Sequence, residues 1–173
     1  MHIYLQPFGE IERPLLEDIG KALQEIYGFP YKINPSRDLP INAFFRKRGQ
    51  WHSSTILEKA LNIGIPEDAE RVLGIADVDL FVENLNFVFG EANPYHGTAI
   101  ISLFRLRPEY YRLPPDEKLF QQRAKKEAIH EIGHTYGLDH CADPRCIMHF
   151  SNTLADTDCK GPSFCEKCRK KLK

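Results

Sequence analysis

The sequence predicts one α+β domain in which a twisted mixed sheet of about four or five strands packs against a long helix. The chain has 173 residues, which is enough for one hydrophobic core but hardly for two. Short runs rich in Val, Ile and Phe alternate with segments whose apolar residues recur at helical spacing. All 5 cysteines lie after residue 140, which indicates a small C-terminal part organised by something other than hydrophobic burial.

The charges of the chain nearly cancel. Its 23 Lys and Arg against 24 Asp and Glu leave a formal net charge of −1, so no overall field favours nucleic acid or anionic lipid as a partner. No apolar run approaches the roughly 20 residues that span a membrane, and residues 1–9 lack the features of an export signal. An odd number of cysteines cannot all pair within the chain. We therefore expect a cytoplasmic protein without membrane contact. We also expect a monomer, an expectation that does not follow from these residues.

Strands are predicted for the runs rich in β-branched and aromatic residues, namely 3–8, 31–33, 71–80, 86–91 and 98–106. Two helices separate the early runs. Residues 11–27 show a helical apolar pattern that Gly28 ends. A shorter second helix is predicted to begin at a cap formed by Ser53 or Ser54.

A long helix is predicted from Asp116 to Gly137, and it carries the pattern H-E-x-x-H-x-x-G-x-x-H. His130 and His134 lie one turn apart on one face, so both imidazoles can bind the same metal ion. His140 lies about 280° around an ideal helix from the first histidine, so the chain must turn back to bring it to that ion. Gly137 permits the turn, because a left-handed conformation costs glycine little.

Three imidazoles leave the fourth position of a tetrahedral zinc ion open for water, which is typical of catalytic rather than structural zinc. Glu131 follows the first histidine and is the candidate general base. A carboxylate beside the metal can accept a proton from a water whose pKa zinc lowers to about 7.

The cysteines form two candidate ligand pairs, Cys141 with Cys146 and Cys165 with Cys168. Their spacing is near that of four-thiolate zinc sites, which predicts a closed structural zinc that orders the C-terminal segment. Two disulfides are the alternative for these four residues. Cys159 is left over, either as a free thiol in a loop or as a substitute for one of the ligands.

The histidine motif continues into Cys141, Cys146, Met148 and the run Cys165-Glu166-Lys167-Cys168. In this order the residues resemble the archaemetzincins, a family of metzincin zinc metallopeptidases. Upstream, the segments 74–80, 86–92 and 101–106 resemble the same family, so the likeness extends over nearly the whole chain.

The resemblance implies a metzincin-like fold over 1–173, with the sheet and active-site helix in an upper part, 1–137, and a zinc-stabilised lower part, 138–173. Two zinc ions per chain are implied, a catalytic one on the three histidines and a structural one on the four cysteines. Met148 is implied to lie in a Met-turn beneath the histidines. The implied reaction is hydrolysis of peptide bonds in peptides or proteins, with Glu131 as general base.

Two features bear on that mechanism. Phe150 stands where astacin-like metzincins have a tyrosine that stabilises the oxyanion, so another donor is needed, and His149 is a candidate by type. The strand 86–91 is a candidate sheet edge at which metzincins bind an extended peptide by strand addition. Phe87 and Phe89 alternate along it, which favours one shared side and, most simply, a role in the core.

Two other functions stay open from the residues alone. A protein can keep such a metal site and bind a peptide or a partner with little or no proteolysis. A nucleic-acid-binding zinc module is the other, but neither aromatic interleaving nor overall basic charge supports it. The basic residues that suggest it are Lys167, Arg169, Lys170, Lys171 and Lys173, for which a solvated tail is favoured.

Overall fold

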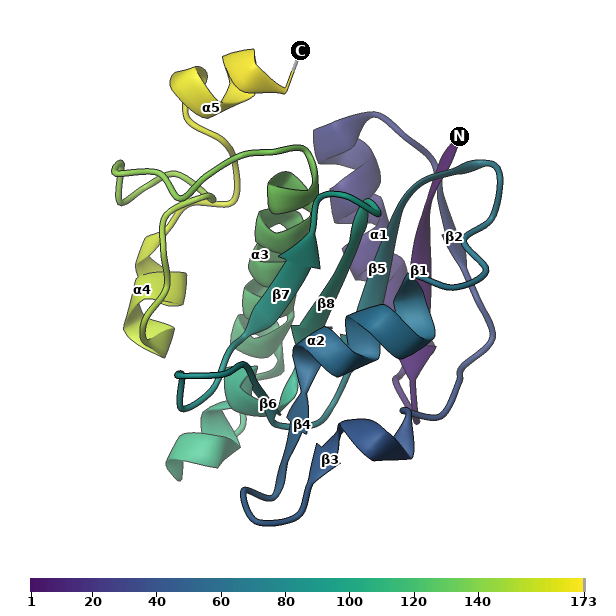
Figure 1. Cartoon of the computed structure of the whole chain (residues 1–173). Helices are drawn as coiled ribbons and strands as arrows, with labels where there is room; N and C mark the ends of the chain where they lie inside the picture. The colour runs from purple at the N-terminus through teal and green to yellow at the C-terminus, as the bar shows by residue number, and fades with distance from the viewer. Residues whose placement is uncertain (173) are drawn as a thin grey trace.

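A five-stranded mixed sheet is the centre of the computed structural model, which describes residues 1–172. The strands lie in the order β2-β1-β5-β8-β7, and only β7, at one edge, runs antiparallel to its neighbour (Figure 1). Their bounds are β1 His2–Phe8, β2 Tyr31–Ile33, β5 Ala69–Ala76, β7 Gly90–Asn93 and β8 Thr98–Ser102. The predicted mixed sheet is confirmed.

Helices cover both faces of this sheet. α1 (Arg13–Tyr27) and α3 (Glu117–Thr135) pack on one face, where they share a core with alternate residues of β1, β5 and β8. α2 (Ser53–Ile56) and the π-helical turn Leu57–Leu61 that continues it lie on the other face (Figure 1). Both faces of the sheet are therefore buried, as is usual for largely parallel strands.

The two long helices end where the sequence predicts. Gly28 closes α1 and Gly137 follows α3, each in the left-handed region with φ of 79° and 78°. At the start of α3 the Asp116 carboxylate accepts a hydrogen bond from the Leu119 N–H at 2.9 Å. Within residues 1–172, no helix is long and apolar enough to cross a membrane.

The predicted cap of the second helix is wrong. His52 holds the N-cap position of α2, and its side chain makes no capping hydrogen bond to the helix backbone. The hydroxyls of Ser53 and Ser54 donate instead to the carboxylate of Glu91 in β7, the latter at 2.7 Å. Hydrogen bonds to a carboxylate are stronger than those to a neutral group, so α2 is tied to the edge strand.

The predicted strand 86–91 is wrong in its first half. Val88 forms an isolated antiparallel bridge with Leu80, and its N–H donates to the Leu80 carbonyl at 2.9 Å. Val88 is thus paired with Leu80 rather than with β8, and the ladder between β7 and β8 begins only at Gly90. The edge of the sheet lies where the sequence suggests, but the strand that forms it is displaced along the chain.

The predicted strands 71–80 and 98–106 are too long, because β5 ends at Ala76 and β8 ends at Ser102. A second, three-stranded sheet, absent from the sequence predictions, lies beside α2. Its strands are so short that their apolar pattern gives no clear periodic signal. They are β3 Phe44–Phe45, β4 Gln50–His52 and β6 Leu80–Phe81.

The C-terminal part carries two short helices, α4 (Leu154–Cys159) and α5 (Glu166–Lys171). Ile147 and Met148 are fully buried in the same core as α3. Cys159 is exposed, and it ends α4 rather than lying in a loop as predicted. The segment after α3 is therefore anchored to the main core by apolar contacts as well as by its cysteines.

Candidate metal centre

Two histidines of α3 point their Nε2 atoms at each other. The Nδ1 of His130 donates to the Ile147 carbonyl at 2.8 Å, and the Nδ1 of His134 donates to the Leu138 carbonyl at 2.7 Å. Because a carbonyl oxygen can only accept, both Nδ1 atoms carry the proton. The two Nε2 atoms, 3.0 Å apart, therefore face each other with lone pairs when the rings are neutral.

The third histidine reaches the same place after the chain turns back. Gly137, whose N–H donates to the His134 carbonyl at 2.9 Å, makes this turn. The ring of His140 then lies with its centroid 4.7 Å from that of His134 and 5.4 Å from that of His130. One nitrogen from each ring lies within 4.8 Å of the others. The structure thus brings together the three histidines that the motif predicts.

This group fits a metal ion such as zinc. Burial lowers the pKa of all three imidazoles, most strongly that of His130, so each is held in the neutral form that binds metals. Two neutral Nε2 atoms at 3.0 Å have no hydrogen to share, and a cation satisfies both lone pairs. The carbonyl partners of the Nδ1 atoms are also the outer-shell partners expected for histidine ligands.

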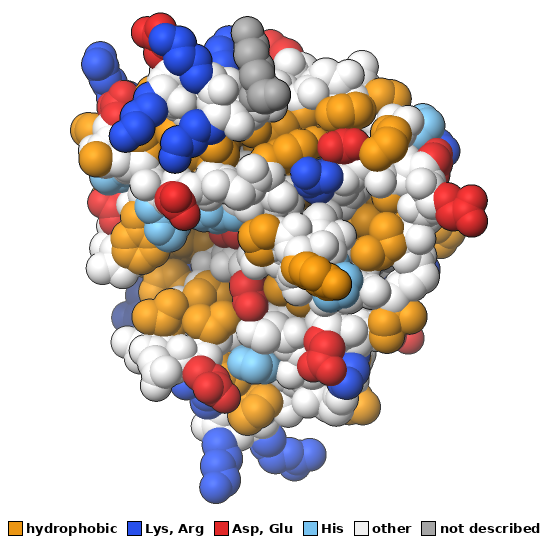
Figure 2. Space-filling view, turned by 45° about the horizontal axis from the view of Figure 1, so that its top comes forward, with side chains coloured by type: hydrophobic (Ala, Val, Ile, Leu, Met, Phe, Trp, Pro, Cys, Tyr) orange, Lys and Arg blue, Asp and Glu red, His pale blue; other side chains and the backbone are white. Residues whose placement is uncertain are grey.

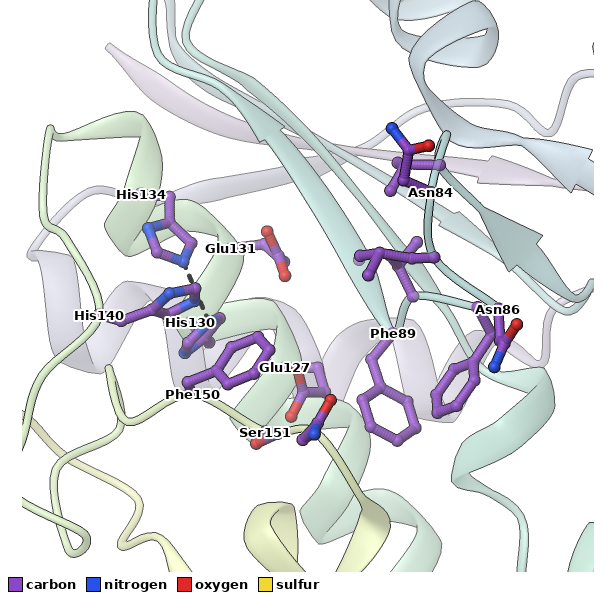
Figure 3. Close-up of a pocket in the computed structure, with 16 residues that line it drawn as sticks. Asn84, Asn86, Phe89, Glu127, His130, Glu131, His134, His140, Phe150 and Ser151 are labelled. Atoms are coloured by element: carbon purple, nitrogen blue, oxygen red, sulfur yellow. Dashed lines mark hydrogen bonds between the residues drawn. The ribbon is translucent and has the colours of Figure 1, made fainter.

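Glu131 lies in the same cavity with a buried side chain. Figure 3 shows its carboxylate between the group of histidines and the segment that carries Phe89. Burial raises the pKa of the Glu131 carboxyl well above its ordinary value, the nearby Glu127 carboxylate adds to the effect, and the Lys160 ammonium opposes it. A carboxylate with a raised pKa binds a proton more readily.

The cavity beside the histidines has a volume of about 490 Å³. In Figure 2 the surface is hollowed next to a group of histidine side chains and is bordered by hydrophobic ones. Phe87 and Phe89 line it as an edge-to-face pair with ring centroids 5.1 Å apart, and Phe150 borders it opposite them. A concave cavity lined by aromatic side chains and a few polar groups is typical of a ligand-binding site.

A fully buried ion pair under the cavity has no counterpart among the sequence predictions. The Nζ of Lys160 lies 2.9 Å from a carboxylate oxygen of Glu127, which also accepts from the Thr157 hydroxyl at 3.1 Å. Glu127 stands one helical turn before Glu131, so helix spacing could have placed it in the cavity. Nothing in the sequence around Lys160 indicates that this lysine is buried.

Met148 packs against the helix that carries His130 and His134. Its side chain is fully buried, and a Cβ added at Gly133 would come within 2.5 Å of its Sδ. The thioether therefore packs directly against the turn of α3 between the two helical histidines.

His149 is engaged elsewhere. Its Nδ1 donates to the Cys141 carbonyl at 2.8 Å, so the neutral ring has no N–H left to offer an oxyanion.

The four predicted cysteine ligands also converge. One sulfur from each lies within 4.8 Å of the others, in the group Cys141, Cys146, Cys165 and Cys168. All the cysteines are free, and the sulfurs of Cys141 and Cys165 lie 3.7 Å apart, far beyond a disulfide bond. A hydrogen bond from the Cys168 backbone is the main cause that lowers the pKa of the Cys165 thiol to about 7. Cys159 is not in the group.

Comparison with known proteins gives concordant matches. The family model described as peptidase family M54 matches residues 47–173. The chain is 46% identical to an archaemetzincin of Methanocaldococcus jannaschii, over 99% of this chain and 93% of that protein. A crystal structure of an archaemetzincin from Archaeoglobus fulgidus, complexed with malonate, matches with a TM-score of 0.84 at 34% identity over 99% of both chains. That of a zinc-dependent peptidase from Methanocorpusculum labreanum matches with a TM-score of 0.89 at 30% identity, over 99% of this chain and 100% of that one.

A mixed sheet, a long helix with two histidines and a third histidine after a glycine turn define the class as a metallopeptidase. The chain belongs to peptidase family M54 and to its archaemetzincins. The predicted family and the metzincin-like fold are thereby confirmed.

Proposed function

We propose that the chain hydrolyses peptide bonds at a zinc ion held by His130, His134 and His140, with Glu131 as general base. The observation that carries this proposal is the convergence of three neutral imidazoles and one buried carboxylate on a single cavity. When bound, zinc polarises the scissile carbonyl and makes water more acidic.

Glu131 moves the proton in this proposal. Its carboxylate accepts a proton from the attacking water and then donates it to the leaving nitrogen, so the peptide is converted to a carboxylate product and an amine. Burial places the side chain in surroundings of low polarity, which together with the nearby Glu127 carboxylate raises its pKa and so makes it a better proton acceptor.

The edge strand β7 is proposed to bind the substrate backbone. The Ser102 N–H donates to the Phe89 carbonyl at 2.8 Å, one position before the first pair of the antiparallel ladder, Gly90 with Ile101. Gly90 and Ala92 therefore fall in non-hydrogen-bonded pairs, and their N–H and C=O groups point away from β8. β7 is the last strand of its sheet, so an extended peptide can add to these groups beside the histidines.

A second, structural zinc is proposed on the four convergent cysteines. Cys141 directly follows His140, and its N–H donates to the Met148 carbonyl at 2.8 Å. A metal on the cysteines would therefore fix the backbone that delivers the third histidine. We propose residues 138–173 as a lower subdomain that this metal orders, below an upper subdomain of residues 1–137.

The test compares zinc-loaded wild type with Glu131→Gln on a library of peptides, followed by mass spectrometry of the products. The matched control is Glu117→Gln, an exposed glutamate on the same helix. Cleavage by wild type and the control but not by Glu131→Gln is expected. A wild type with full zinc content that cleaves nothing would instead indicate a peptide- or partner-binding protein.

A further inference from the structure

Gly90, the first residue of β7, lies directly against the side chain of Glu131. A Cβ added at Gly90 would come within 2.5 Å of the Glu131 Cγ, and within 2.7 Å of both its Cδ and its Oε1. Contacts this short do not occur between real side chains, so any larger residue at this position displaces the carboxylate or the strand.

Backbone conformation does not explain why glycine stands here. The glycines with positive φ among the described residues are Gly9, Gly28, Gly49, Gly64, Gly97 and Gly137, and Gly90 is not one of them. Its neighbours in the strand, Glu91 and Ala92, carry side chains. The backbone conformation of Gly90 therefore permits any L-residue. A side chain is excluded because Glu131 occupies the space that its Cβ would need.

The strand cannot easily move aside. On one side Gly90 pairs with Ile101 of β8. The next residue, Glu91, is tied to α2 by the hydroxyls of Ser53 and Ser54. β7 is thus held in place by β8 and α2. A larger residue at position 90 would therefore displace the side chain of Glu131 rather than the strand.

We propose that Gly90 is a positioning residue for Glu131: its missing side chain sets how closely the edge strand approaches and so holds the carboxylate in place. This inference rests on the proposed role of Glu131 as general base. The same residue offers its outward N–H and C=O groups to the substrate edge, so one position aligns both the peptide backbone and the base.

The first test is a double-mutant cycle on thermal stability, which needs no substrate. Gly90→Ala is expected to lower the Tm of wild type and to leave that of Glu131→Ala unchanged or higher, because the second substitution removes the atoms that the methyl group would meet. Gly20→Ala is the matched control, since its Cβ would meet the Tyr31 ring at 2.3 Å. It is expected to shift the Tm equally in both backgrounds. An equal fall in Tm for Gly90→Ala in both backgrounds would overturn the inference.

The second test separates positioning from folding. In zinc-loaded protein, Gly90→Ala is expected to lower kcat about 100-fold, as misplacement by about 1 Å does, while KM and zinc content change less than about two-fold. Combined with Glu131→Asp, which retracts the carboxylate, Gly90→Ala should cost little further. A full kcat in Gly90→Ala would overturn the inference even if Glu131→Gln is inactive. Full activity in Glu131→Gln would instead remove the proposed function, whereas the Tm cycle would still report on the contact.

Discussion

The ammonium of Lys160 lies 2.9 Å from the carboxylate of Glu127, and both side chains are almost fully removed from solvent. Loss of one partner of a buried pair is costly, because the other charge stays buried without compensation. We expect Lys160→Met to lower the free energy of unfolding by about 3–5 kcal/mol. Urea denaturation of the zinc-loaded protein measures this change.

The control for that prediction is an exposed ion pair of the same kind. Lys170 and Glu166 form a pair whose side chains are 74% and 83% exposed, so Lys170→Met should change stability by less than about 1 kcal/mol. Adding Glu127→Gln to Lys160→Met should recover much of the loss, since no charge is then left unpaired. If Lys160→Met costs no more than Lys170→Met, the buried pair does not stabilise the fold.

The contact between Gly133 and Met148 links the core to the histidine-bearing helix. Gly133→Ala would place a Cβ 2.5 Å from the Met148 Sδ, so it should lower the Tm and weaken zinc retention at the neighbouring His134. Met148→Ala removes the obstacle but leaves a cavity, at a cost of about 2–5 kcal/mol. We expect the double variant to lose less stability than the sum of the single losses. Strict additivity in calorimetry would argue against this contact.

The cysteine cluster gives a prediction about metal content. Cys168→Ser should reduce bound zinc from two ions per chain to one and lower the Tm, because the sulfur of Cys168 lies within 4.8 Å of the other three. Cys159→Ser should change neither quantity, since this thiol is exposed and outside the cluster. Inductively coupled plasma mass spectrometry of purified protein counts the zinc. One zinc in wild type would remove the two-site arrangement.

Asp68 makes stability depend on pH at the amino ends of β1 and β5. Its carboxylate accepts hydrogen bonds from the Tyr4 hydroxyl at 2.6 Å, the Lys32 ammonium at 2.9 Å and the His2 ring at 2.8 Å. These donors, led by Tyr4, hold the pKa of Asp68 well below its ordinary value of 3.8. A group whose folded pKa is lowered stabilises the fold above its unfolded pKa and loses that contribution as the pH falls through the folded one.

We therefore expect wild type to be more stable than Asp68→Asn by a constant amount above about pH 5. The difference should shrink as the pH falls below about 4, where the unfolded carboxyl takes up its proton. Urea denaturation of both proteins from pH 7 to 2 measures the difference. A gap that widens toward low pH would show that the folded pKa of Asp68 is raised instead.

Local signals made the long helix and the metal centre predictable. The signals lie within one stretch of chain: Asp116 caps the helix, Gly137 makes the turn, and the histidines follow at fixed spacing. Local spacing therefore determines the arrangement of the helix and its histidines. The cysteine cluster was predictable for the same reason. The short spacing within each pair indicates a common metal site, whatever conformation the chain between the pairs adopts.

Partners distant in the sequence explain what could not be predicted. Ser53 looks like a helix cap, but a carboxylate 38 residues away, that of Glu91, takes its hydroxyl. The strand expected from residue 86 starts later because Val88 bridges to Leu80. Lys160 belongs to a polar stretch that follows Asp156 and Asp158, and it is buried because the tertiary fold brings Glu127 to it.

The most direct test of the central claim is the ratio of kcat/KM between wild type and Glu131→Gln, measured on one cleaved peptide at equal zinc content. The amide keeps the size of the side chain but cannot accept the proton. A fall of about 10²–10⁴-fold with both zinc ions retained is expected if Glu131 is the general base. Equal kcat/KM values for the two zinc-loaded proteins would contradict that role.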